Sequence, residues 1–283
     1  MEDKFTSERL ESVIERISEA SRQRLVYFDV EPGRNSLFES KIGGLPYLPR
    51  NAAVPKNEDG KELCFFGQFL FDDMPAADIN LPPTGLLQVW LLNDRTTGTD
   101  SYSVRSAETS LAKQLIYYPD LDRTVTEAEV RARYQPAADG TFPVQGEFAI
   151  TYYEGEQTHH NSSDNDYREQ FIAIWNELYP DDEIEDEEEY YDIVSEELED
   201  LDEFDPEYGN QLGGYPHFFT EDNRTEETGL ADYTVTLLAL EGDVAFPDGS
   251  RIRFAPGAIV YFFMTAADLD RRDFSRIFYT WIY

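Results

Sequence analysis

The spacing of apolar positions along the chain predicts helices near its start and its centre. Over residues 6–22, Leu10, Val13 and Ile17 recur at intervals that place them on one face of a helix. Two further helices are expected, one over 126–134, which opens with capping-box spacing between Thr126 and Glu129, and one over 166–178.

Apolar or alternating runs predict that most of the remaining chain forms strands. Val, Ile and aromatic residues dominate these runs, and turn-forming Gly, Pro, Asn and Asp separate them. The expected strands cover 25–30, 63–71, 85–92, 114–118, 147–153, 233–240, 258–264 and 277–283.

A strongly acidic segment lies between Asp181 and Glu207, with 17 Asp or Glu and no Lys or Arg. Like charges at neighbouring helical positions destabilise a helix by about 0.2–0.5 kcal/mol per pair. An apolar stripe runs through the segment, and burying each of its side chains contributes about 1.5–3 kcal/mol, which outweighs the repulsion. We therefore predict a helix with an acidic outer face, and a disordered acidic linker is the alternative. The helix is expected over 186–202, with Tyr191, Val194, Leu198 and Leu201 as its stripe.

Two segments of the chain repeat. The sequence Lys-Ile-Gly-Gly-Leu-Pro-Tyr at 41–47 returns as Gln-Leu-Gly-Gly-Tyr-Pro-His at 211–217, an offset of 170 residues. A predicted strand opens on Gly85 and another on Gly257, an offset of 172. A repeat of this length indicates two related halves rather than a solenoid of short units.

The fold class expected is α+β and β-rich, built from two similar halves by internal duplication. Each half would be a mainly antiparallel sheet with flanking helices, and the two would share one core. We expect a single domain over 1–283, with halves at about 25–155 and 205–283 joined by a helical acidic segment at 160–205.

Several motifs resemble those of the YwqG-like family of uncharacterised bacterial proteins. They are the stretch 40–49, the Phe-Gly-Gln-Phe strand at 66–69, the Gly-Leu-Leu-Gln strand at 85–88, the second Gly-Gly turn and the 268–275 segment. The resemblance covers roughly residues 5–283 and implies a soluble, largely β or α+β protein with internal duplication. It transfers no catalytic residue. Because some family members are thought to lie beside secreted toxin systems, the resemblance also implies an immunity role.

The repeated glycine pairs mark the candidate binding site. Glycine pairs suit tight turns, because glycine adopts backbone angles that other residues resist. If the two turns are related by pseudo-symmetry, they flank one cleft, and ligand sites often lie in such concave regions. The alternative is a purely structural role in two turns. The candidate ligand-binding residues are Gly43, Gly44, Tyr47, Gln68, Gly213, Gly214 and His217.

Catalytic, metal and cofactor signatures give no assignment. The chain has no Walker loop, Rossmann fingerprint, zincin helix or nucleophile elbow, so no catalytic residue is predicted and no cofactor is expected. His159 and His160 are adjacent, and adjacent side chains in an extended segment diverge, so we expect a polar loop and no metal site there.

The net charge restricts the classes of partner that the protein is expected to bind. The formal net charge is −35, which repels phosphate backbones and anionic membrane surfaces, so neither nucleic acid nor membrane is expected as a partner. Cys64 is the only cysteine, which excludes an intrachain disulfide, and the first residues lack the pattern of a signal peptide. We therefore expect a cytoplasmic protein.

Three functional hypotheses remain at this point. The first is a non-catalytic interaction protein whose acidic surface binds a basic protein, with toxin immunity as one form of that role. The second is a small-molecule binding protein or an enzyme with a cleft between the halves. The third is weak binding of divalent metal by the acidic segment.

Overall fold

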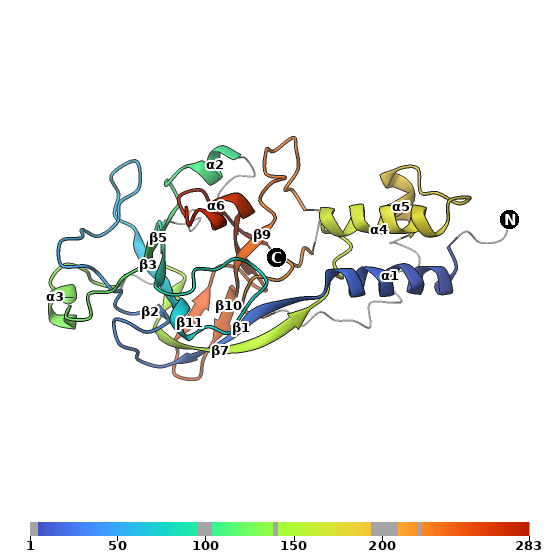
Figure 1. Cartoon of the computed structure of the whole chain (residues 1–283). Coiled ribbons are helices and arrows are strands. Elements are labelled where there is room, and N and C mark those ends of the chain that lie inside the picture. Colours follow the sequence, from blue (N-terminus) through green and yellow to red (C-terminus); the bar gives the residue numbers. More distant parts are fainter. Residues whose placement is uncertain (1–4, 95–103, 138–140, 194–208, 220–221, 283) are drawn as a thin grey trace. The chain divides into compact units, whose positions relative to one another are not determined.

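A computed structural model describes residues 5–94, 104–137, 141–193, 209–219 and 222–282 (Figure 1). The described residues fall into two compact units. Unit 1 draws on the segments Met1–Arg24, Glu156–Tyr208 and Gly214–Asp222, and unit 2 on Leu25–Gly155, Gly209–Gly213 and Asn223–Tyr283.

Unit 1 is helical. Helices α1 (Ser7–Ser21) and α4 (Asn165–Leu178) lie side by side, and the short α5 (Glu187–Ile193) follows α4 in the chain (Figure 1). Their apolar faces form one core, because helices with a single apolar stripe must bury it against another element. The core contains Leu10, Val13, Ile17, Tyr167, Phe171, Trp175, Ile184 and Tyr190.

Unit 2 is built on a ten-stranded sheet in which every pair of known register is antiparallel. Its order is β13-β12-β9-β8-β1-β7-β2-β3-β4-β5. The strands are β1 (Gln23–Pro32), β2 (Lys41–Gly43), β3 (Cys64–Leu70), β4 (Leu86–Leu91), β5 (Lys113–Tyr118), β7 (Glu147–Gln157), β8 (Gln211–Leu212), β9 (Val235–Glu241), β12 (Ile259–Met264) and β13 (Phe278–Ile282).

Smaller elements surround this sheet. A second, three-stranded sheet joins β10 (Asp243–Ala245), β11 (Arg251–Arg253) and β6 (Val144–Gln145). The helices are the 3-10 turn η1 (Phe71–Asp73), α2 (Val104–Glu108), α3 (Glu127–Arg131) and α6 (Ala266–Asp270). The protein is therefore a mostly antiparallel β structure with a few helices, as the β-rich α+β prediction states.

Read outward from its centre, the large sheet has four strands on each side, and on both sides these strands follow one another in chain order. Strands β1 and β7 lie at the centre, and β8, β9, β12 and β13 on one side match β2, β3, β4 and β5 on the other in chain order. The two central strands are swapped between the sides. Strand β1 precedes β2 in the chain but pairs with β8, and β7 precedes β8 but pairs with β2.

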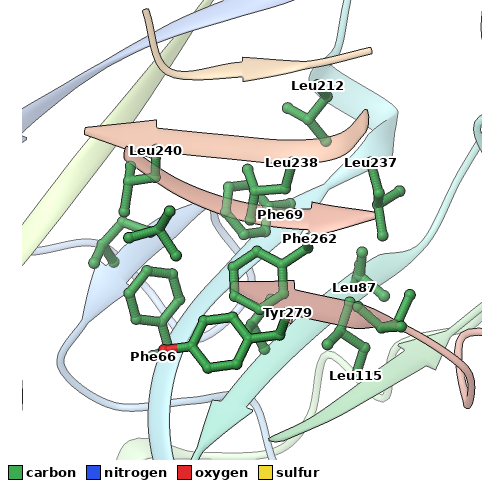
Figure 2. Packing of buried hydrophobic residues seen from close by; sticks show 14 of the residues in the cluster. Phe66, Phe69, Leu87, Leu115, Leu212, Leu237, Leu238, Leu240, Phe262 and Tyr279 are labelled. Atoms are coloured by element: carbon green, nitrogen blue, oxygen red, sulfur yellow. The ribbon is translucent and has the colours of Figure 1, made fainter. Parts of the chain in front are cut away.

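We call strands β2, β3, β4 and β5 the first arm of this sheet and strands β8, β9, β12 and β13 the second arm. The main core lies between these two arms. Figure 2 shows Phe66 and Leu87 of the first arm facing Leu238 and Phe262 of the second, and the ring centroids of Phe66 and Phe262 are 6.1 Å apart. All ten strands contribute buried or partly buried residues to this cluster. The inner face of each arm is therefore buried by the other arm.

A second core covers the outer face of the first arm. There α3 and the segment 45–52 pack over Phe65 and Trp90. Arg133, just after α3, fixes this segment by donating to the backbone oxygens of Leu48 at 3.0 Å, Pro49 at 2.7 Å and Ala52 at 2.8 Å. One guanidinium thus bonds three carbonyls of this segment, of which the Pro49 oxygen also accepts from the backbone N–H of Ala52 at 2.9 Å.

Most of the predicted elements are present at shifted bounds. The helix predicted over 126–134 is the shorter α3, and the capping box at Thr126 and Glu129 is formed. The predicted acidic helix is described as α5, while residues 194–208 lie outside the described residues. Of the predicted stripe, only Tyr191 lies within the described residues, and it is 39% exposed whereas its neighbour Tyr190 is fully buried; Val194, Leu198 and Leu201 lie outside the described residues. Within the described residues, no helix combines the length and apolarity needed to cross a bilayer.

Candidate functional site

The first Gly-Gly turn follows β2 and is closely packed. Gly43 and Gly44 both adopt left-handed φ angles, 70° and 71°. A Cβ atom on Gly43 would lie 2.3 Å from the backbone oxygen of Gly146, and one on Gly44 would lie 2.4 Å from the carboxyl carbon of Glu147. The turn therefore uses glycine for backbone angle and for close approach, and its surface is occupied by the protein itself.

A buried lysine adjoins this turn. The Lys41 side chain is 1% exposed, and its Nζ lies 3.3 Å from Oε1 of Glu147 and donates to the backbone oxygen of Asn35 at 3.0 Å. Burial lowers the pKa of Lys41, and the charge of Glu147 opposes that effect. The pair ties β2 to β7, which lie next to each other in the sheet.

Gln68 belongs to a buried amide network. Its Oε1 accepts from the backbone N–H of Tyr47 at 3.0 Å and from Nε2 of Gln88 at 3.2 Å. Its Nε2 donates to the backbone oxygens of Leu37 at 2.9 Å and Glu39 at 2.7 Å. Each side-chain lone pair and proton of Gln68 is thus used.

Gln88 and Tyr47 extend the network. Nε2 of Gln88 donates to the backbone oxygen of Tyr47 at 2.7 Å, and Oε1 of Gln88 accepts from Nε1 of Trp90 at 3.1 Å. The hydroxyl of Tyr47 accepts from the backbone N–H of Asp122 at 2.9 Å. Tyr47 is only 1% exposed, so a ligand at this position would have to displace hydrogen bonds within the protein.

The second Gly-Gly turn follows β8 and has the same backbone angles. Gly213 and Gly214 have φ of 80° and 76°. The space above Gly213 is occupied by Ile79, which would lie 3.3 Å from an added Cβ. Nε2 of Gln211 donates to the backbone oxygen of Gly213 at 2.9 Å and stabilises the turn.

His217 belongs to unit 1, where all three histidines of the chain lie. Its Nδ1 is 2.7 Å from Nδ2 of Asn161. His159 is fully buried, stacks on Tyr215 at 4.1 Å between ring centroids, and has Nε2 3.4 Å from Oδ2 of Asp164. Within the described part of the chain, no group of three or more His, Cys, Asp or Glu side chains is placed to hold a metal ion.

The predicted site residues therefore divide between the two units. Gly43, Gly44, Tyr47 and Gln68 come together around β2 and β3 of unit 2, and Gly213 belongs to the same unit. Gly214 and His217 belong to unit 1. That all seven residues serve one ligand stays a prediction. Lys41, Gln88 and Glu147 are polar residues of the first cluster that the sequence did not single out.

The described cavities are small. One has a volume of about 210 Å³ and lies between β5 and the segment that precedes β13; the other, of about 270 Å³, is lined by the 71–83 loop. Pockets for drug-sized ligands usually enclose about 300–1,000 Å³. Neither cavity is lined by a predicted site residue.

The acidic charge of unit 1 has few basic counterparts. Arg9 pairs with Asp182 at 2.8 Å, Arg16 with Glu177 at 2.6 Å and Arg168 with Glu187 at 3.2 Å. The arginines are thus already engaged with carboxylates of the same unit. Further acidic side chains remain exposed on the described part of the acidic segment, namely Asp181, Glu183, Glu185, Asp186, Glu188 and Asp192.

The comparison with family models identifies the chain. Residues 40–282 match the family described as a domain of unknown function, DUF1963. The chain belongs to this family. A comparison with curated proteins finds no match. The match runs from just before β2 to β13, so it includes every strand of the large sheet except β1, together with the unit 1 segments that lie between β7 and β9 in the chain.

We predict that Gly43→Ala destabilises the protein more than Gly60→Ala. Both glycines have left-handed φ, 70° and 79°, so both variants incur about 1–2 kcal/mol of backbone strain. Only at Gly43 does an added Cβ meet backbone, whereas nothing lies within 4 Å at Gly60. Thermal unfolding should show a larger decrease in Tm for Gly43→Ala. Equal decreases would show that the turn is not closely packed.

Gln68→Ala is expected to lower the free energy of unfolding by at least about 3 kcal/mol. The substitution leaves several buried donors and acceptors without partners, at about 1–3 kcal/mol each. Gln135→Ala is the matched control, because Gln135 makes an exposed hydrogen bond to the Arg131 backbone oxygen at 2.7 Å. Urea unfolding measures both, and a similar small loss in each would contradict a structural role for the network.

Because of His160, the free energy of unfolding should decrease as pH falls below about 6.5. Burial, and secondarily the charge of His159, lower the pKa of His160 from its ordinary value of 6.5. The folded state therefore binds this proton less readily than the unfolded state, so stability is lost as pH falls through the unfolded pKa.

Urea midpoints at about pH 7.5 and about pH 5.5 test this dependence. The midpoint of wild type should fall more than that of His160→Asn over this interval. Because other titrating groups are common to both proteins, an identical fall would remove His160 as the cause.

Proposed function

We propose that the protein is a non-catalytic interaction protein whose acidic unit 1 surface binds a basic protein. The observation that carries the proposal is that Arg9, Arg16 and Arg168 are consumed by ion pairs within unit 1 while exposed carboxylates remain. Such a field attracts cationic surfaces over a Debye length, about 8–10 Å at physiological salt, and speeds their association. A cytoplasmic location follows as part of this proposal.

The structural roles of the predicted ligand-binding residues support this proposal over the alternatives. Tyr47 and Gln68 are buried and hydrogen-bonded to the protein itself. A small-molecule site around them would need to break that network, so we rank it second. Divalent-metal binding by the acidic segment is ranked third, because the part of that segment within the described residues brings no three carboxylates together to hold a metal ion.

We further propose that unit 2 arose by duplication and that the protein is YwqG-like. Support comes from the matching strand order on the two sides of β1 and β7, and from glycine pairs with left-handed φ after β2 and after β8. Gly85 and Gly257, before β4 and β12, also share positive φ, 97° and 68°. On this proposal β7 begins the second half, the unit 1 helices α4 and α5 are insertions between β7 and β8, and α1 precedes the first half. The YwqG resemblance favours a toxin as the basic partner, which the protein would neutralise by occlusion.

The test is affinity capture from native lysate with matched variants. Asp181→Asn, Glu185→Gln and Glu188→Gln together remove three exposed charges of unit 1 that take part in no described ion pair. The control variant removes three exposed charges of unit 2 through Glu31→Gln, Asp59→Asn and Asp120→Asn.

Wild type and the unit 2 variant are expected to retain the same basic protein, and the unit 1 variant to bind it on the order of tenfold more weakly. Capture should also fall as salt rises toward about 0.5 M, where screening is strong. Recovery of no basic protein, equal capture by both variants, or capture indifferent to salt would refute the proposal.

A further inference from the structure

The segment between η1 and β4 is a loop whose two ends are held together. The backbone N–H of Phe71 donates to the backbone oxygen of Gly85 at 2.9 Å, and the N–H of Gly85 donates to Oδ2 of Asp72 at 2.8 Å. Between these ends, residues 74–81 form neither helix nor strand. A compact surface loop with joined ends is an Ω-loop, and such loops are frequently functional. We call residues 74–83 the lid.

The side chains of the lid divide between an inner and an outer face. The inner ones are partly buried and pack against the main core, namely Ala77, Ile79 and Leu81. The residues at 76, 78 and 80, which lie between or beside them in the chain, are exposed. Ile79 also occupies the space above Gly213, where an added Cβ would lie 3.3 Å from it. The lid therefore covers the turn at Gly213.

The packing of the lid is incomplete. A cavity of about 270 Å³ is lined by Phe71 and by residues of the lid alone. Side chains that border such a space forgo contacts that they would make in a filled core. The lid also contains Pro75, Pro82 and Pro83, which have no N–H to donate. Both features make it easier to lift the lid than to separate the two arms of the sheet.

Asn80 joins the lid to α6 and to the residues that end this helix. Nη1 of Arg272 donates to the backbone oxygen of Asn80, and Nη2 donates to Oδ1 of the same residue at 3.1 Å. Nδ2 of Asn80 donates in turn to Oδ1 of Asp270 at 2.8 Å. Hydrogen bonds from a charged donor are about twice as strong as neutral ones. We call the contact between Arg272 and Asn80 the latch.

Arg272 occupies a backbone position that ordinarily belongs to glycine. Its φ is 58°, and within the described ranges no other residue except glycine has a positive φ. The N–H of Arg272 donates to the oxygen of Leu269 at 3.0 Å. The N–H of Asp273 donates to the oxygen of Asp268 at 2.9 Å, which completes the Schellman motif that ends a helix. Glycine adopts this conformation without strain, so the arginine side chain has to offset a cost, and the latch supplies the offsetting contact.

We propose that the lid opens as a unit while the sheet stays folded, and that the latch sets how often it does so. Opening lifts Ile79 away from Gly213 and exposes the backbone of that turn. The joined ends of the loop confine the movement to the residues between them. The lid, the latch and Gly213 all belong to unit 2, so the proposal is independent of the acidic surface of unit 1.

Thermolysin cleavage of the full chain measures the opening. This protease cuts before apolar residues, so Ile79 and Leu81 offer sites within the lid. Under native conditions the cleavage rate follows the population of the open form. Mass spectrometry separates initial cuts within the lid from cuts within β4, which require the sheet to unfold. In wild type we expect the lid to be cut at least about tenfold faster than β4. Equal rates would show that the lid opens only on global unfolding and would overturn the proposal.

Arg272→Gly removes the latch and keeps the turn that ends α6. It should raise cleavage of the lid about tenfold, because the bonds to Asn80 are lost. Cleavage of β4 should stay within about twofold of wild type, because glycine relieves the strain at this position. Arg271→Ala is the matched control, since Arg271 is the preceding arginine and donates to Asp268. Its lid should be cut within about twofold of the wild-type rate. Unchanged cleavage of the lid in Arg272→Gly would overturn the proposal.

Asn80→Ala weakens the latch from the side of the lid. It removes the side-chain bonds to Arg272 and Asp270 but keeps the backbone oxygen, so cleavage of the lid should rise less, about threefold. Rates are divided by those of a free peptide that spans residues 70–86 with the same substitution, which removes any change in the preference of the protease. A corrected rate at or below that of wild type would refute the latch, as would an equal rise in Arg271→Ala.

Discussion

The structure of unit 2 depends on the burial of two sheet arms against each other. Phe66 of β3 contacts Phe262 of the second arm at a ring-centroid distance of 6.1 Å, and it contacts Phe254, which follows β11 of the three-stranded sheet, at 5.9 Å. Each fully buried side chain of this kind contributes about 1.5–3 kcal/mol, and residues of the three-stranded sheet, among them Val144 and Ile252, complete the same core. The turns, the helices and the polar network all have to fit around this packing.

Polar groups inside the second core, on the outer face of the first arm, must be satisfied within the protein, and this explains the residues around the first glycine pair. Gln68 and Gln88 lie on paired strands and are both fully buried, so they bond to each other and to the segment that crosses them. Lys41 is buried nearby, and the carboxylate of Glu147 supplies the counter-charge for its ammonium group. Gly44 then has to be glycine because the Glu147 side chain occupies the space of a Cβ. Residues that resemble a binding site by pattern thus hold the fold together.

The sequence predicts long apolar strands well, but it does not predict which polar side chains come together in the fold. The runs that form β3, β4, β9 and β12 are mostly apolar and are buried on both faces, which is a strong local signal. Strands β2 and β8 are too short to show a period, and only the glycine pairs after them are visible. In the acidic helix the sequence favours Tyr191 as a buried position, whereas Tyr190 is the buried one, because adjacent tyrosines are distinguished only by packing. Gln88 could not be recognised, because its partners come from segments distant in sequence.

The swap of the two central strands has a consequence for how the chain is made on the ribosome. Strand β2 is flanked by β3 and by β7, which is synthesised about a hundred residues later, and β1 reaches its neighbour β8 only when residues 211–212 have emerged. During most of translation, β1 and β2 therefore each have an edge without its hydrogen-bonded neighbour. Nascent chains released early would carry these edges uncovered, which makes truncated products substrates for chaperones and prone to aggregation.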